Sequence, residues 1–200
     1  MQVVEAPLPL NRVRDAAIFE VLGIDFAGPV YLKVGQKAWI CLFTCAIFRA
    51  VHFELTTSLS TECFLEAFRR FTARRGRTSD VYTDNGKNFV GMGNLLKAIN
   101  WGRVVEVSNI QKIKWHFSPP TAAWWGGFWE RVVGVLKRLL RKVLKRSSLY
   151  YEEMCTVLCD CEAVICSEYL FMSMKNFWYG FCVKFNAIRF TIIFLMYNDF

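Results

Sequence analysis

Three apolar segments near the start of the chain constrain the fold more than any other feature of the sequence. They occupy residues 18–26, 38–46 and 50–56, and turn residues such as Gly35 lie between them. β-Branched and aromatic residues dominate these segments, and the third alternates between apolar and polar positions, so that successive side chains face opposite ways as in a strand. Because short turns join antiparallel neighbours, the spacing predicts an antiparallel meander of three strands.

Helical and extended segments alternate after this meander. Ser60 is a good N-cap and Gly76 lies where a helix C-cap is expected. The patterns predict, in order, a helix over 61–75, a strand over 80–83, a helix over 89–99, a strand over 113–117, and helices over 128–145 and 150–166. Alternation of this kind predicts an α/β fold, a mixed five-stranded sheet flanked by helices.

Length and composition favour a single globular domain. The chain has 200 residues, of which 54% are hydrophobic and 21% charged, and this excludes a disordered chain. We expect an N-terminal linker over 1–15, one domain over 16–167 and a divergent, aromatic-rich tail over 168–200. Lys184, Asn186 and Arg189 interrupt the apolar run of the tail, so we expect an appendage outside the domain more than a membrane helix.

The charge balance points to an anionic partner. Lys and Arg number 25 against 17 Asp and Glu, which gives a net charge of +8. A basic single domain is suited to a polyanion or an anionic surface. The N-terminus does not follow the pattern of a signal peptide, and the eight cysteines are too sparse for a disulfide scaffold. We therefore expect reduced thiols in an intracellular protein, with no zinc site.

Three acidic residues lie where strands or helices meet loops. Asp25 lies within an apolar strand, Asp84 ends the segment VYTDNG, and Glu130 opens a long basic helix. Carboxylates that converge at one end of a sheet make an all-oxygen site for two Mg²⁺ or Mn²⁺ ions, which activate phosphodiester chemistry. Taken singly, Asp84 also fits a turn and Glu130 a favourable first-turn acid, whereas Asp25 is costly to bury without a partner.

Two basic clusters have a functional and a structural interpretation each. At about 100° per residue, four cations lie near the same side of their helix as Glu130: Lys137, Arg138, Arg141 and Lys145. They fit phosphate contacts, or else the solvated face of an amphipathic helix. The second cluster is Arg69, Arg70, Arg74, Arg75 and Arg77, at the end of the first helix. It fits the helix dipole, with contact to target DNA as the alternative.

These residues lie in segments that resemble a known family. GIDFAGPV, TDNGKNFVG and GGFWERVVGVLKRLLRKVL, in this order, resemble the integrase catalytic core of retroelements, most closely that of BEL/Pao-type retrotransposons. The resemblance covers about residues 12–166. It implies a ribonuclease H-like fold with a D-D-E triad of Asp25, Asp84 and Glu130 that holds two Mg²⁺ or Mn²⁺ ions. It also implies that Asn85 shapes the active-site floor and that Asn88 contacts DNA or supports the site.

The implied activity is DNA integration by a polynucleotidyl transferase and endonuclease. The enzyme would trim the 3′ ends of element DNA and join them to target DNA. Element and target DNA are then the partners, with self-association expected, no small-molecule substrate, no membrane role, and action in the nucleus. Two alternatives remain: a truncated, catalytically silent remnant that binds nucleic acid, and a nuclease of the same fold that cuts with water and joins nothing.

Overall fold

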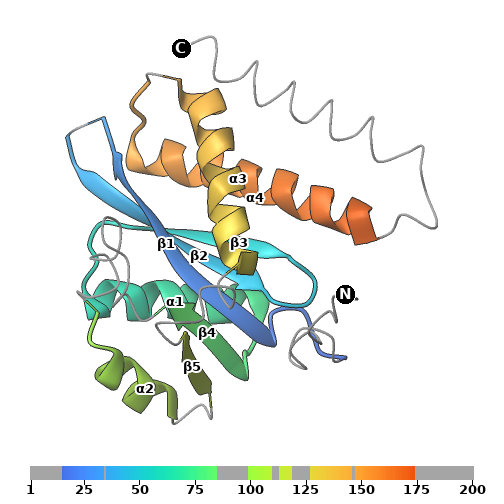
Figure 1. The fold of residues 1–200 in the computed structure, drawn as a ribbon. Helices are drawn as coiled ribbons and strands as arrows, with labels where there is room; N and C mark the ends of the chain where they lie inside the picture. Colours follow the sequence, from blue (N-terminus) through green and yellow to red (C-terminus); the bar gives the residue numbers. More distant parts are fainter. Residues whose placement is uncertain are drawn as a thin grey trace, which may run out of the picture.

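The protein is described by a computed structural model, which covers residues 15–33, 35–84, 99–109, 113–118, 127–145 and 147–173. Helices cover both faces of a central sheet (Figure 1). The strands are β1 (Val21–Tyr31), β2 (Lys37–Cys45), β3 (Val51–Thr56), β4 (Asp80–Asp84) and β5 (Lys114–Ser118). The helices are α1 (Thr61–Arg75), α2 (Trp101–Asn109), α3 (Gly127–Leu144) and α4 (Tyr151–Ser173).

The sheet is mixed, with strand order β3-β2-β1-β4-β5. β1, β2 and β3 form the predicted antiparallel meander. β4 lies parallel to β1, and β5 lies parallel to β4. The five-stranded mixed sheet predicted from the sequence is therefore confirmed, and β1 is its central strand.

β1 differs from its predicted limits at both ends. It begins at Val21, because the preceding residues form a turn in which the N–H of Glu20 donates to the carbonyl of Ala17. It continues beyond residue 26 through an irregularity in its register with β2, between Ala27 and Val30. Gly28 has a φ of 139° there, and a Cβ at this position would lie 3.2 Å from the carbonyl oxygen of Ala38. The bulge lets the strand pass a Gly-Pro pair that ordinarily ends one.

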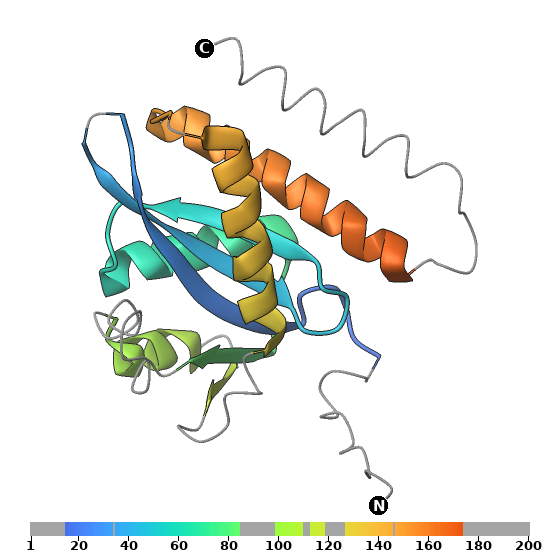
Figure 2. The same cartoon turned by 45° about the horizontal axis from the view of Figure 1, so that its top comes forward.

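Each face of the sheet buries its own apolar cluster. On one face, Phe64, Phe68 and Phe71 of α1 pack against Phe43 of β2 and its neighbours. On the other, α3 and α4 pack against alternate residues of the same strands, such as Leu42. Figure 2 shows α3 and α4 crossing this second face, away from α1. Period-2 alternation in buried strands sends successive side chains to the two clusters, so the sheet divides the core into two layers.

The two ends of α1 are capped as predicted, whereas α2 was not expected from the sequence. Ser60 caps α1 by accepting a hydrogen bond from the N–H of Cys63, and Gly76 ends it with a φ of 93°. α2 was not predicted; the carboxamide oxygen of Asn100, which accepts the N–H of Arg103, is the local signal that we missed. The predicted helix over 89–99 lies, except for its last residue, outside the described residues.

α4 is longer than its sequence pattern predicts. It was expected to end near residue 166 but continues to Ser173, so the first residues of the predicted tail are helical. Among the described residues, no helix is both long and apolar enough to cross a membrane. The seven cysteines in this part of the chain form no disulfide with one another.

Candidate active site

Asp25 lies in the middle of the central strand. Strand alternation places it on the same face as Val21 and Ala27, which is the face that α3 covers. Its side chain is partly buried, and its Oδ1 accepts a hydrogen bond from the N–H of Phe26 at 2.7 Å. A carboxylate here points to the sheet surface from a strand whose other residues are mostly buried.

The register of β1 and β4 brings the two predicted aspartates to adjacent positions. Ile24 pairs with Thr83, and each is followed by one of the aspartates, Asp25 on β1 and Asp84 on β4. Asp84 is also the last residue of β4, where it pairs with Ser118 of β5. For Asp84 the structure describes the position of the backbone and not that of the side chain. Every β1–β4 pair from Val21 onward joins residues that are the same number of positions apart in the sequence. Asp25 and Asp84 are separated by that same number, so the parallel pairing explains their spacing.

The start of α3 is held over these two strands by one aromatic side chain. Trp129 is only 1% exposed and packs against Val21 of β1 and Tyr82 of β4. Glu130 follows it in the first turn of the helix and is exposed. The burial of Trp129 therefore fixes the third predicted carboxylate on the face of the sheet that also carries Asp25.

The donor set fits a hard divalent cation. Asp25, Asp84 and Glu130 offer carboxylate oxygens alone, which Mg²⁺ and Mn²⁺ prefer. Within the part of the chain whose side chains are described, no three Asp, Glu, His or Cys side chains form a group that could hold a metal. The full triad thus stays a prediction, since only two of its side chains belong to that part.

α3 has the predicted two sides, with apolar residues buried against the sheet and most of its cations exposed. Val132, Leu136 and Leu140 turn toward the sheet and are buried. Arg138 and Arg141 are exposed, and Lys137 is partly buried at the margin. Lys145 lies one residue beyond the helix, in a turn with a φ of 49°, and its N–H donates to the carbonyl of Arg141.

Two further exposed cations of α3 were missed by the sequence reasoning. They are Arg131 and Lys142, each near the edge of the face that carries Glu130. The signal was available, because both lie within about 120° of Glu130 on the helical wheel. Asn85 and Asn88, the remaining predicted site residues, lie outside the described residues.

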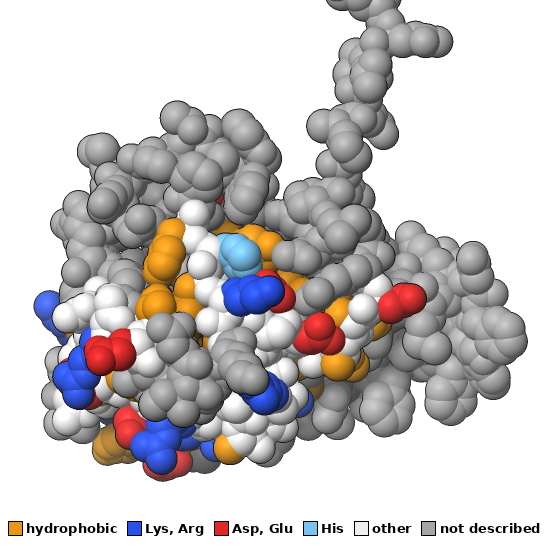
Figure 3. Space-filling model, turned by 90° about the horizontal axis from the view of Figure 1, so that it is seen from below, with side chains coloured by type: hydrophobic (Ala, Val, Ile, Leu, Met, Phe, Trp, Pro, Cys, Tyr) orange, Lys and Arg blue, Asp and Glu red, His pale blue; other side chains and the backbone are white. Residues whose placement is uncertain are grey.

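A side-chain hydrogen bond between β4 and β5 was also not foreseen. His116 Nε2 lies 2.9 Å from Asp80 Oδ1, and the His116 ring stacks on Tyr82 with centroids 4.6 Å apart. Seen from below, the molecule shows basic, acidic and hydrophobic side chains intermixed among the described residues (Figure 3). The described part of this surface is thus not a patch of a single charge sign.

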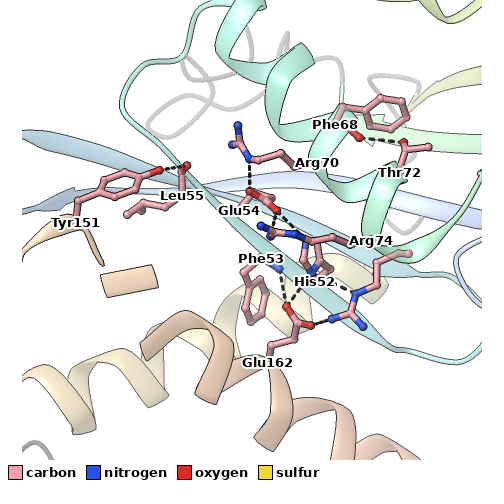
Figure 4. A network of polar contacts seen from close by, with 11 residues as sticks. His52, Phe53, Glu54, Leu55, Phe68, Arg70, Thr72, Arg74, Tyr151 and Glu162 are labelled. Atoms are coloured by element: carbon pink, nitrogen blue, oxygen red, sulfur yellow. Dashed lines mark hydrogen bonds and ion pairs between the residues drawn. The ribbon is translucent and has the colours of Figure 1, made fainter. Parts of the chain in front are cut away.

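The arginines at the end of α1 serve a structural network. Arg70 Nε and Arg74 Nη1 each lie 2.7 Å from a carboxylate oxygen of Glu54 on β3 (Figure 4). Arg75 pairs with Glu162 of α4. Burial alone raises the pKa of Glu54, but hydrogen bonds from His52 and Arg70 outweigh it and hold that pKa below its ordinary value. These three cations are committed to carboxylates, which favours the structural interpretation of the cluster.

Comparison with known proteins identifies the fold. No protein-family model matches the sequence, and no curated protein does. One similar solved structure is the simian T-cell lymphotropic virus intasome in complex with PP2A regulatory subunit B56 gamma, determined by cryo-electron microscopy. The TM-score is 0.59 at 17% identity, over 79% of this chain and 52% of that one, so this chain spans about half the length of that relative.

Two similar structures are isolated catalytic cores. They are the HTLV-2 integrase catalytic core domain in complex with magnesium, in its dimeric and trimeric forms. The TM-scores are 0.52 and 0.51 at 18% identity, over 74% of this chain and 87% and 86% of those chains. The chain therefore has the ribonuclease H-like fold of integrase catalytic cores, as the resemblance implied.

Proposed function

We propose that this chain is the catalytic core of a retroelement integrase of the BEL/Pao type. It carries out 3′-end processing of element DNA and transfer of the new 3′ ends to target DNA. Asp25, Asp84 and Glu130 are its D-D-E triad and hold two Mg²⁺ or Mn²⁺ ions. The observation that carries the proposal is the β1–β4 register, in which the two aspartates follow a paired Ile24 and Thr83.

The elements around the triad have the rigidity that such a site needs. Asp25 comes from the central strand of the sheet, where its backbone pairs with Leu42 of β2 and directly follows the last residue of β1 that pairs with β4. The N–H of Phe26 orients one oxygen of its carboxylate. Trp129 fixes the first turn of α3, and so the position from which Glu130 extends. Sites built on strands and helices hold reacting groups more accurately than sites on loops.

In this proposal the metal ions activate the reacting groups, and the side chains hold the ions and the DNA. Bound divalent ions would lower the pKa of an attacking water or 3′-hydroxyl and stabilise the leaving oxygen of the phosphodiester. The three carboxylates hold those ions. Lys137, Arg138, Arg141 and Lys145 bind DNA phosphates beside the site, with Asn85 and Asn88 as further contacts. No side-chain nucleophile is required.

The similar structures support the wider features of the proposal. The HTLV-2 cores were solved with magnesium and as dimer and trimer, and the simian virus protein belongs to an intasome. We propose that this chain likewise uses a divalent metal, self-associates and binds element and target DNA. Its place of action would be the nucleus, where target DNA lies.

The test is metal-dependent strand transfer by the full chain on a branched DNA substrate. We expect joined product with Mn²⁺ or Mg²⁺ and none with chelator. Asp84→Asn should lower the rate by more than about 10³-fold, as for a group that acts as part of a catalytic unit. Asp15→Asn, the same change at an exposed residue outside the sheet, is the matched control and should leave the rate unchanged.

The outcomes separate the alternatives. Cutting without joining, under either metal, would indicate a nuclease of the same fold. DNA binding with neither cutting nor joining would indicate a catalytically silent remnant. Wild-type rates in Asp84→Asn would exclude the triad as assigned.

A further inference from the structure

The turn of the β1–β2 hairpin is fastened to the connection between α3 and α4. The N–H of Lys33 donates to the carbonyl of Leu149 at 2.9 Å. Leu32, which precedes it, is buried in the same apolar cluster as α3 and α4. Figures 1 and 2 both show this hairpin beside the connection between α3 and α4. Segments that are far apart in the sequence therefore form one continuous surface here.

Two exposed tyrosines with lysines above their rings mark this surface. The Nζ of Lys33 lies 4.7 Å from the centroid of the Tyr150 ring, and the Nζ of Lys37 lies 5.9 Å from that of Tyr31. Tyr31 is 59% exposed and Tyr150 49% exposed. Lysine next to an exposed aromatic ring is a combination that nucleic-acid surfaces use, since the cation binds phosphate and the ring contacts sugar or base.

The charge around these tyrosines is predominantly positive. The described residues of the hairpin turn, the end of α3 and the start of α4 carry five cations: Lys33, Lys37, Arg141, Lys142 and Lys145. The same segments carry two carboxylates, Glu152 and Glu153. One of these, Glu153, accepts the backbone N–H of Tyr150 at 2.7 Å and so serves the start of α4. An anionic partner is favoured at this surface.

The position of the surface along α3 suggests how DNA reaches it. Glu130 lies in the first turn of α3 and Lys145 just beyond its last turn. Fifteen residues at about 1.5 Å each span about 22 Å. That is about six base pairs of duplex. The exposed cations of α3 lie between the two ends, so a duplex that follows the helix from Glu130 arrives at the hairpin.

We propose that the hairpin surface, made by Tyr31, Lys33, Lys37 and Tyr150 with the cations at the end of α3, binds the phosphate backbone of duplex DNA. The contact lies about six base pairs from the reacting phosphodiester. This distance rests on the proposed function, whereas the binding itself does not. Lys33 and Lys37 contact phosphates, and the hydroxyls of the tyrosines donate to phosphate or sugar oxygens.

The test measures binding of the full chain to a fluorescent duplex of about 20 base pairs, between about 50 and 200 mM salt. The double variant Lys33→Gln, Lys37→Gln should raise Kd at least about tenfold and make the slope of log K against log salt shallower by about 2. The matched control is Arg103→Gln with Lys114→Gln, two exposed cations on α2 and β5. The control should keep both the wild-type Kd and the wild-type slope.

A second variant controls for the possibility that the lysine substitutions disturb the local structure. Tyr150→Ala removes a ring without changing the charge, and it should raise Kd while leaving the slope unchanged. The proposal is overturned if the lysine double variant binds DNA like the wild type, or if the control loses as much affinity. It is also overturned if the double variant loses binding to poly-glutamate but not to DNA, which would identify an acidic protein as the partner.

Failure of this inference is distinguishable from failure of the proposed function. Asp84→Asn should bind the duplex with the wild-type Kd while losing strand transfer. If Asp84→Asn joins DNA at the wild-type rate and the lysine double variant still binds weakly, the triad fails and the hairpin contact stands. If strand transfer needs Asp84 but the double variant binds normally, the proposed function stands and the hairpin contact fails.

Discussion

Glu162 of α4 lies against His52 of the edge strand β3, with 2.9 Å between Glu162 Oε2 and His52 Nδ1. The same oxygen accepts the backbone N–H of Phe53 at 3.2 Å. Tyr151 and Cys166, also on α4, bond to the backbone of Leu55 and Val51. These contacts engage backbone groups of Val51, Phe53 and Leu55 on the edge strand, which would otherwise present an open sheet edge.

Replacement of Glu162 should therefore destabilise the fold. Glu162→Ala removes the carboxylate that His52, Arg75 and the N–H of Phe53 share, and leaves a buried donor unsatisfied. We expect the free energy of unfolding to fall by about 2–3 kcal/mol, less than for a fully buried pair because Arg75 is partly exposed. Guanidinium unfolding measures this. Glu152→Ala, an exposed position on the same helix, should stay within about 0.5 kcal/mol of wild type, and an equal loss in both variants would contradict the edge role.

Glu54 should make stability depend on pH in the acid range. Its pKa in the folded protein is held below the ordinary value of 4.5, because hydrogen bonds from His52 and Arg70 outweigh the effect of burial. A lowered folded pKa contributes stability above the unfolded pKa and loses it as pH falls through the folded one. Thermal unfolding between about pH 7 and 3 should therefore show a decline below about pH 4.5 that is shallower in Glu54→Gln. An unchanged pH profile in that variant would exclude the effect.

Glu130 should matter for activity and not for stability. It is exposed, while its neighbour Trp129 provides the packing of this turn. Glu130→Gln should change the free energy of unfolding by less than about 0.5 kcal/mol and abolish metal-dependent strand transfer. Measurements of thermal unfolding and of strand transfer on the same variant test the two parts of this prediction. Glu106→Gln, the same change at an exposed position of α2, should affect neither, and retained joining in Glu130→Gln would remove this residue from the triad.

The thiols of α4 should differ sharply in reactivity. Burial, with a contribution from Asp160, raises the pKa of Cys161 to about 12, so it is protonated at neutral pH. Cys159 is exposed. We expect iodoacetamide at about pH 8 to alkylate Cys159 in the folded protein and to reach Cys161 only after unfolding. Mass spectrometry of the modified peptides reads this out, and rapid alkylation of Cys161 would show that α4 does not pack as described.

Local signals in the sequence predicted most of the strands and helices. Alternation identified β3, Ser60 and Gly76 marked the ends of α1, and an apolar stripe identified α3. Each of these signals lies within a few residues of the element it specifies, because side-chain periodicity and caps act over one or two turns. The failures were local as well: the bulge at Gly28 extended β1, and the cap at Asn100 started an unpredicted helix.

The candidate site was predicted as a set of residues but not as a geometry. The sequence supplied Asp25, Asp84 and Glu130, yet only strand pairing relates the first two, and only the burial of Trp129 brings the start of α3 to the sheet. The arginines of α1 show the limit most clearly. Their sequence fits a helix end, with DNA contact as the alternative, whereas the fold gives them Glu54 and Glu162 as partners.

The sequence by itself therefore determined the type and order of the described elements other than α2, the composition of the candidate site and the basic face of α3. Tertiary structure alone decided which charges are paired, how the open edge of β3 is covered, and that the β1–β2 hairpin meets the connection between α3 and α4. The physical reason is separation along the chain. Phe53 and Glu162 are 109 residues apart, and no local pattern records a contact that forms only when the sheet and α4 pack together.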